Sequence, residues 1–407
     1  MKVPTRTRAC SVAACLLLGV SSSFAQQTVS MAEAVEAAWR RTLDAAVTAG
    51  QLRQAQAEQT AAQAWWAGSP ALELSHRTDR LQTNDGARET EVGLAVPLWL
   101  PGQRSARLGV ADAEATAAHT AETLARWQLT GTLRELAAEV ELRRAESGIA
   151  DQEANAMRQL HIDVDRRVAA GDLARADALA AQAEWQAAAS AGLRAREQRE
   201  RAELQWQAAT GLTAVATLPA PRAEPGDPAT TDSHPQLLDA RERVEVARRR
   251  LALVDSSQRS APELVTRWRQ ETDRRGAPNA YSVGLALRIP FGTDDRNRPL
   301  QAQALQALDI AEAGLRQARW QVDAQAATQR LALATGVYLS EDEAHRASLL
   351  RERATLIDQS FQAGETALPD LLRARAAAAQ AEASALRQRL ASRLAMARLQ
   401  QALGVHP

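Results

Sequence analysis

The sequence predicts a mainly α-helical protein that carries two short β-hairpins and is built from two similar halves. Three observations support this prediction. Alanine fills 90 of the 407 positions and aromatic residues only 3%, a composition typical of long helices packed closely around thin cores. Segments with alternating apolar and polar residues interrupt the helical pattern. Both the interruptions and the glycine turns that follow them occur twice, at a nearly constant offset.

Residues 1–25 have the pattern of a secretory signal peptide. A basic start precedes an apolar stretch at residues 9–20, and a small-x-small motif ends at Ala25, where we expect cleavage. The apolar stretch is too short to act as a membrane-spanning anchor. Cys10 and Cys15 leave with this leader, so the mature chain contains no thiol. The sequence before Cys15 loosely resembles a lipoprotein cleavage box, but too little apolar sequence precedes it, and we expect no acyl anchor.

The remaining chain contains an internal repeat. Val-Gly-Leu-Ala at residues 92–95 recurs at 283–286, an offset of 191, and Ala-Gly-Asp at 170–172 recurs as Ala-Gly-Glu at 363–365, an offset of 193. Chance similarity between alanine-rich helices would not keep glycines and strand-like segments in step. The linker between the halves is rich in proline, which neither a helix nor a central strand accommodates. We therefore divide the mature chain into a first repeat at 26–217, a linker at 218–234 and a second repeat at 235–407.

Each repeat contains one predicted hairpin, at about 71–97 and at about 263–290. Residues 281–289 alternate throughout, and nine residues is the length that a tilted strand needs to cross a bilayer. The alternative is a hairpin packed in water against a helix. The alanine-rich helices offer little apolar cover for such faces, so lipid is the more suitable solvent. Aromatic residues suited to an interfacial belt flank or lie in the strands: Trp65, Trp66, Trp99, Trp268 and Tyr281.

Four strands cannot close a barrel by themselves. An open sheet edge in lipid would leave backbone hydrogen-bonding groups without partners, which costs several kcal/mol for each group. Three chains would supply twelve strands, enough for a small outer-membrane barrel. The strand count therefore predicts a homotrimer whose transmembrane β-barrel lies in outer-membrane lipid.

The rest of each repeat is predicted to be helical. Residues 103–168 and 300–361 contain little that would break a helix, and at 1.5 Å per residue they would span about 99 Å and about 93 Å. The shorter predicted helices are 30–67, 176–210, 235–257 and 370–403. Because two short helices roughly equal one long helix in length, we expect them to stack end to end alongside it.

A coiled-coil seam supports side-by-side helix packing. Along the second long helix, small and larger apolar residues alternate in steps of four and three: Ala304, Leu308, Ala311, Leu315, Ala318 and Val322. An ordinary antiparallel bundle would show the same periodicity. Together with the export signal, the hairpins and the matched helix lengths, the seam favours a hollow helical cylinder that continues a membrane barrel.

The sequence offers no catalytic, cofactor or metal site. It contains no glycine-rich nucleotide loop and no Gly-x-Ser-x-Gly elbow, and its acidic residues alternate with arginine at helical spacing, as on solvated helix faces. The six histidines have no metal-ligand spacing. The formal net charge of zero argues against nucleic acid as a partner. We expect passive conduction and no enzymatic activity.

Over nearly its whole mature length the chain resembles the TolC-type outer-membrane efflux proteins. The matching features are the duplicated halves, the strand that ends in Pro290-Phe291-Gly292, the exit into a long helix at 97–104, and the glycine turns at 170–172 and 363–365. The resemblance implies a trimeric duct with a long periplasmic helical barrel. It also implies two protein partners, a periplasmic adaptor and an inner-membrane pump of the RND type.

The resemblance further implies that the glycine turns form the periplasmic tip, where the adaptor binds and the channel narrows. Gly364 matches the tip glycine and Asp370 an acidic residue of the constriction, while Gly171 and Asp177 are their counterparts in the first repeat. Arg373 departs from the family pattern, since drug-exporting members have a second acidic residue there. We expect the gate to be held by pairing of Asp370 with Arg373. The alternative is that both aspartates only complement the dipole at a helix start.

Two questions stay open at this stage. The segment 98–107 looks like the strand-to-helix junction of the heavy-metal cation efflux branch, but outer-membrane ducts contact their cargo little. Metal cations and drugs therefore both remain candidate substrates. A type I secretion exit duct would have the same fold, and a periplasmic coiled-coil adaptor or scaffold would also be exported and helical.

Overall fold

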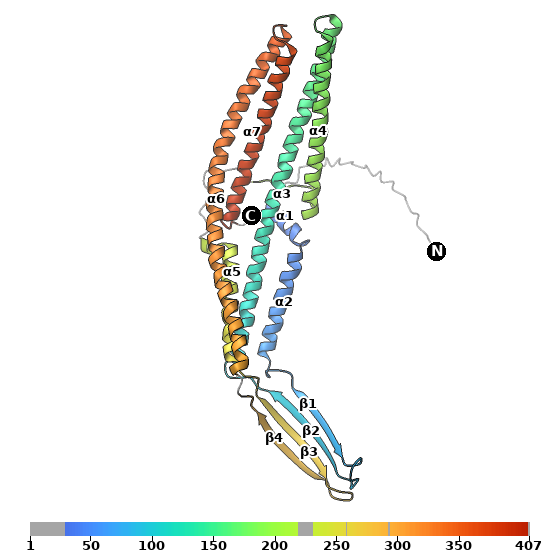
Figure 1. The fold of residues 1–407 in the computed structure, drawn as a ribbon, viewed down its shortest axis with the longest axis vertical. Helices are drawn as coiled ribbons and strands as arrows, with labels where there is room; N and C mark the ends of the chain where they lie inside the picture. The colour runs from blue at the N-terminus through green and yellow to red at the C-terminus, as the bar shows by residue number, and fades with distance from the viewer. Residues whose placement is uncertain (1–28, 219–230, 258, 292–293, 406–407) are drawn as a thin grey trace, which may run out of the picture.

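The computed structural model describes residues 29–218, 231–257, 259–291 and 294–405. The predicted signal peptide and most of the predicted linker lie outside these residues. The molecule is elongated, with a β-sheet at one end and long helices that run away from it to two helical turns at the other end (Figure 1). The order of elements, helix, hairpin, long helix and shorter helix, occurs twice along the chain.

The two predicted hairpins form one antiparallel sheet of four strands in the order β1-β2-β3-β4. The strands are β1 (Ala71–Thr78), β2 (Arg88–Pro97), β3 (Glu263–Thr272) and β4 (Ala280–Arg288). The pairing of β2 with β3 joins strands from different hairpins and places Gly93 opposite Arg267. As a result β1 and β4 are the two edge strands of the sheet.

Two long helices extend from the sheet. α3 (Gln103–Ala170) has 68 residues and α6 (Asp294–Gln362) has 69, which corresponds to about 100 Å each. The shorter helices are α2 (Leu43–Gln63), α4 (Arg175–Thr210), α5 (Pro235–Ser256) and α7 (Leu368–Ala402). α2 and α4 both pack against α3, and α5 and α7 both pack against α6. The predicted arrangement, two short helices alongside each long one, is confirmed.

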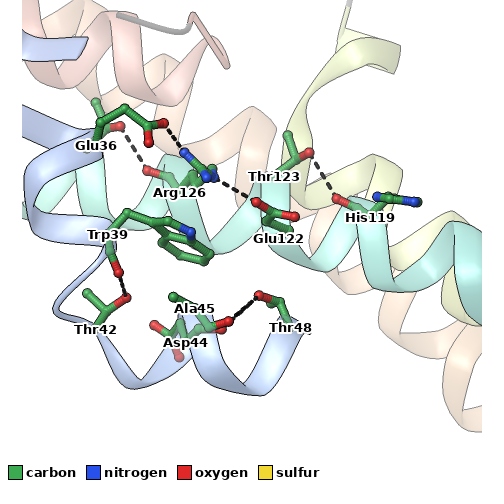
Figure 2. A network of polar contacts seen from close by, with 11 residues as sticks. Glu36, Trp39, Thr42, Asp44, Ala45, Thr48, His119, Glu122, Thr123 and Arg126 are labelled. Atoms are coloured by element: carbon green, nitrogen blue, oxygen red, sulfur yellow. Dashed lines mark hydrogen bonds and ion pairs between the residues drawn. The ribbon is translucent and has the colours of Figure 1, made fainter. Parts of the chain in front are cut away.

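The predicted single helix at 30–67 is wrong, because the chain bends at residues 40–42. The structure has two helices there, α1 (Met31–Trp39) and α2 (Leu43–Gln63). The Thr42 hydroxyl donates to the Trp39 carbonyl at 2.9 Å and closes the bend. The Trp39 ring lies under the Arg126 guanidinium of α3, with 4.6 Å between the ring centroid and the guanidinium carbon. Arg126 also pairs with Glu36 of α1 (Figure 2). These contacts fix α1 against α3 and set the start of α2.

The core is thin and lies between helices, as the alanine-rich composition predicts. Midway along α3, Leu133, Ala137 and Val140 are buried by α1, by Trp206 of α4 and by residues 212–218. Along α6 the buried residues follow the predicted seam and continue it at spacings of four, seven or fourteen residues. They are Ala318, Val322, Ala326, Leu333, Ala347 and Ala354. Small side chains at these positions allow the helix backbones to approach closely.

Candidate functional site

One face of the β-sheet is apolar and exposed. Strand side chains alternate between faces, and the register brings the apolar ones to the same face. Its most exposed members are Leu72, Leu74, Tyr281, Val283, Leu285 and Leu287. Val283 and Leu285 are 79% and 72% exposed. Trp268 stacks on Tyr281 at one end of this face, with ring centroids 6.0 Å apart. We call this surface the apolar sheet face.

The opposite face of the sheet is lined with charges. Arg267 pairs with Glu91 at 3.4 Å, and Arg269 pairs with Glu89 across the same two strands. At the edge strands, Arg77 pairs with Glu89 at 3.7 Å, and Arg288 pairs with Glu263 at 3.0 Å. The two pairs made by Arg267 and Arg269 cross the boundary between the two hairpins, so they reinforce the β2–β3 pairing. The sheet therefore separates an apolar surface from a polar, charge-balanced one.

Gly171 ends α3 at the helical tip. Its φ of 87° lies in the left-handed region that favours glycine, and the N–H of Asp172 bonds the carbonyl of Arg167 at 2.9 Å. Asp177 lies in the first turn of α4, where its carboxylate accepts from the N–H of Ala174 at 3.2 Å. Asp177 thus makes a helix-capping contact at the start of α4.

Gly364 makes the equivalent turn between α6 and α7, with φ 80°. Asp370, in the first turn of α7, accepts from Arg373 Nη2 at 2.8 Å, so the structure contains the predicted pair within one chain. Their side chains are 52% and 77% exposed, and such exposed pairs contribute about 0–1 kcal/mol. The two tip aspartates therefore have different partners, a backbone N–H in the first repeat and an arginine in the second.

The two tip hairpins are joined by an apolar cluster just below the turns. Arg167 of α3 lies over the ring of Phe361 of α6, 5.0 Å from the centroid, and donates to the Phe361 carbonyl at 3.2 Å. The cluster comprises Met157, Leu160, Val164, Ala181, Phe361, Leu368 and Leu371. Separation of the hairpins at the tip would expose these side chains to water, so apolar packing holds the two hairpins together there.

An exposed line of large apolar side chains runs along α6, and our sequence analysis missed it. Its members are Trp320, Leu331, Tyr338, Leu349 and Leu356, which are 53–69% exposed. They are spaced by 11, 7, 11 and 7 residues, which correspond to about three and two helical turns. The line therefore follows one face of α6, opposite the buried seam. This spacing was visible in the sequence but was obscured by the shorter-period seam. We call it the α6 line.

The α6 line lies on an outer helix of the chain. Figure 1 shows α6 along one lateral edge of the helical region, while α2 and α4 form the other edge. α2 and α4 also carry exposed apolar residues: Leu43, Val47, Leu179, Leu193 and Leu204. One edge of the chain thus offers apolar side chains that could pack against the opposite edge of a second copy. Such head-to-tail contacts generate closed rings when the rotation closes.

Within the described ranges, no group of three or more His, Cys, Asp or Glu side chains is arranged to hold a metal ion. None of the described helices is both long and apolar enough to cross a membrane. The candidate functional features described above are the sheet faces, the helical tip and the α6 line.

These features define a class of proteins in which a β-sheet continues into two long helices, each flanked by shorter ones. No family model matches the sequence, and no curated protein sequence matches it. Among solved structures, the chain is similar to CusC (14% identity, TM-score 0.77), with 93% of this chain and 92% of CusC covered. It is also similar to the Campylobacter jejuni outer-membrane channel CmeC (12%, TM-score 0.75), with 99% and 94% covered. A third similar structure is the Vibrio cholerae outer-membrane protein VceC (15%, TM-score 0.73), with 92% and 96% covered.

The chain has the fold of the TolC-type outer-membrane channels, as the resemblance predicted. The likeness covers the helices and the sheet together, because more than nine-tenths of each chain is matched in all three comparisons.

Proposed function

We propose that this protein is the outer-membrane channel of a tripartite efflux system. In this role three copies form a twelve-stranded β-barrel in the outer membrane and a helical duct that reaches into the periplasm. A periplasmic adaptor and an inner-membrane pump of the RND type deliver substrates, which pass through the duct without any catalytic step. The structural likeness to CmeC, described as an outer-membrane channel, supports this role.

The single observation that carries the proposal is the two-faced sheet. Its apolar face has no cover within the described chain, whereas its other face is lined with ion pairs. In a barrel these become the lipid-facing and lumen-facing surfaces. The edge strands β1 and β4 must pair with neighbouring copies for the barrel to close. A periplasmic coiled-coil adaptor would not need a sheet with a lipid-facing surface.

The helical tip is the proposed site of gating and adaptor docking. In this proposal Gly171 and Gly364 shape the turns, Asp177 caps α4, and Asp370 with Arg373 braces the tip of α7. The two repeats, 26–217 and 235–407, each supply one of the two tip hairpins, joined by the linker 218–234. The contact of Asp370 with Arg373 at 2.8 Å and the apolar cluster beneath it support this arrangement.

The proposal is tested by conductance in planar lipid bilayers. The purified, signal-processed protein should form oligomers in detergent and should insert as pores of uniform conductance. Heat-dissociated monomers from the same preparation serve as the control and should form no pores. Absence of pores from intact oligomers would contradict the channel function.

Asp370→Ala should increase the open fraction of these pores. The substitution removes one exposed ion pair per chain, and a pair of this kind shifts an equilibrium by a factor of about two to five. Arg373→Ala should have the same effect, because it removes the same pair. Arg346→Ala, which removes an exposed ion pair of the same spacing with Glu343 (3.3 Å) on α6 outside the tip, is the matched control and should leave the open fraction unchanged. Wild-type behaviour of both Asp370→Ala and Arg373→Ala would remove this pair from the gate.

A further inference from the structure

A polar junction joins the middle of α3 to the end of α7. The Trp127 indole N–H donates to the Gln401 carbonyl at 3.1 Å, and the Gln401 side-chain amide donates to the Trp127 carbonyl at 2.6 Å. Gly131 lies on α3 one turn after Trp127 and next to the Gln401 side chain. A Cβ at this position would come within 3.1 Å of Gln401 Nε2, so a larger residue would displace the glutamine amide slightly.

Arg134, one turn further along α3, is the charged residue of this junction. It is only 6% exposed, and burial lowers the pKa of its guanidinium. Its Nη1 donates to Gln401 Oε1 at 2.6 Å and to the Ala397 carbonyl at 3.4 Å. Both acceptors are neutral. Within the described part of the chain, Nε and Nη2 of Arg134 donate no hydrogen bond.

The neighbouring carboxylate does not neutralise Arg134. Glu135 accepts two hydrogen bonds from Arg398, at 2.6 and 2.8 Å. No carboxylate of the described residues lies within 4.0 Å of the Arg134 guanidinium. A buried guanidinium without a counter-charge is unfavourable, since the group has lost most of its hydration. The other buried or half-buried arginines of α3, such as Arg126 and Arg143, are paired with glutamates.

A cavity of about 370 Å³ lies beside Arg134, between α3, α6 and α7. Most of its exposed wall is apolar, and its polar lining comes from the Glu135–Arg398 ion pair and from the uncharged side chains of Gln128, Thr132, Gln325, Gln329 and Gln401. Gln128 and Thr132 are exposed, so the cavity opens to solvent on the side of α3 that α1 does not cover. The volume far exceeds that of a single water molecule, about 30 Å³.

We propose that this cavity is a binding site for a small oxyanion, with Arg134 as its positive centre. The free N–H groups of a guanidinium form a planar fork that matches two oxygens of a carboxylate or phosphate group. The amide NH₂ groups of Gln128, Gln325 and Gln329 supply further donors of the kind that such a group requires. A bound oxyanion would provide the counter-charge that Arg134 lacks in the chain alone. This site does not depend on the proposed channel function.

The proposal is tested with inorganic phosphate as the probe and the purified, signal-processed protein in detergent as the receptor, whatever its oligomeric state. Phosphorus NMR line broadening is measured over a phosphate titration at constant ionic strength, with chloride as the balancing anion. We expect saturable binding that acetate displaces, because both are oxyanions. Binding to Arg134→Gln should be weaker by about tenfold or more, the effect of losing a hydrogen-bonded charged donor.

Three further variants separate this role from a general effect of charge or folding. Arg134→Lys should retain part of the binding. Arg144→Gln removes one positive charge from the same helix, but Arg144 pairs with Glu203 at 2.7 Å outside the cavity, so its phosphate binding should equal that of the wild type. Glu135→Gln removes a negative charge at the cavity rim and should tighten binding.

Two results would overturn the proposal. One is the absence of saturable phosphate binding to the wild type, as expected if a carboxylate of a neighbouring copy occupies the cavity. The other is equal phosphate binding by wild type and Arg134→Gln, which would place the bound anion elsewhere on the protein.

Discussion

Leu285→Arg is expected to abolish insertion of the protein into the outer membrane. Leu285 is 72% exposed and lies near the middle of the apolar sheet face, between the aromatic pair at Tyr281 and the end of β4. An arginine that faces lipid at the bilayer midplane costs about 2–4 kcal/mol in a β-barrel, and a trimer would carry three of them. The measurement is the amount of heat-resistant oligomer in the outer-membrane fraction after expression.

The matched control for this experiment is Gly284→Arg. Gly284 is the preceding residue of β4 and therefore points to the charged face of the sheet. A Cβ built there meets no atom within 4 Å, so the new side chain has room. This variant should insert as well as the wild type. If both variants insert normally, the apolar sheet face does not contact lipid and the proposed membrane role fails.

Leu331→Glu is expected to dissociate the oligomer. Leu331 is 69% exposed in the single chain and is the second residue of the α6 line. In the proposed ring this line packs against α2 and α4 of the next copy, so the substitution would bury an unpaired carboxylate at every interface. Leaving such a charge unpaired costs about 3–5 kcal/mol. Size-exclusion chromatography with light scattering in detergent should detect a shift from oligomer to monomer.

Ala332→Glu is the control for the α6 line. Ala332 is also exposed, but it lies about 100° further around the helix, away from both the line and the buried seam. The added carboxylate should remain in water and leave the oligomer intact. An oligomer that survives Leu331→Glu unchanged would show that the chains do not meet along α6.

Much of the fold was predictable because its local signals are strong. Long stretches without proline, ended by a glycine that can adopt a positive φ, predict the two long helices and their turns at Gly171 and Gly364. Strict alternation predicts the strands at 91–96 and 281–289 to within a few residues. The pairing of Asp370 with Arg373 was also predictable, since residues three apart on a helix are neighbours.

Other features depend on contacts between distant residues. The bend after Trp39 was missed because it depends on Arg126, which lies 87 positions further along the chain. The junction at Arg134 was missed for the same reason, since its partner Gln401 is 267 residues away. Neither contact leaves a periodic pattern in the sequence, and arginine on an amphipathic helix ordinarily indicates a solvated face.

The sequence by itself determined the two-fold order of elements, the helix lengths and the alternation of the strands, because periodicity and turn residues act over short distances. Only the tertiary structure decided that β2 pairs with β3, so that two hairpins become one sheet with an apolar and a charged face. It also decided which face of α6 stays uncovered and which arginine is buried without a carboxylate. These outcomes depend on how close the two halves of the chain come in space, and the free energy of that packing is shared among residues far apart in the sequence.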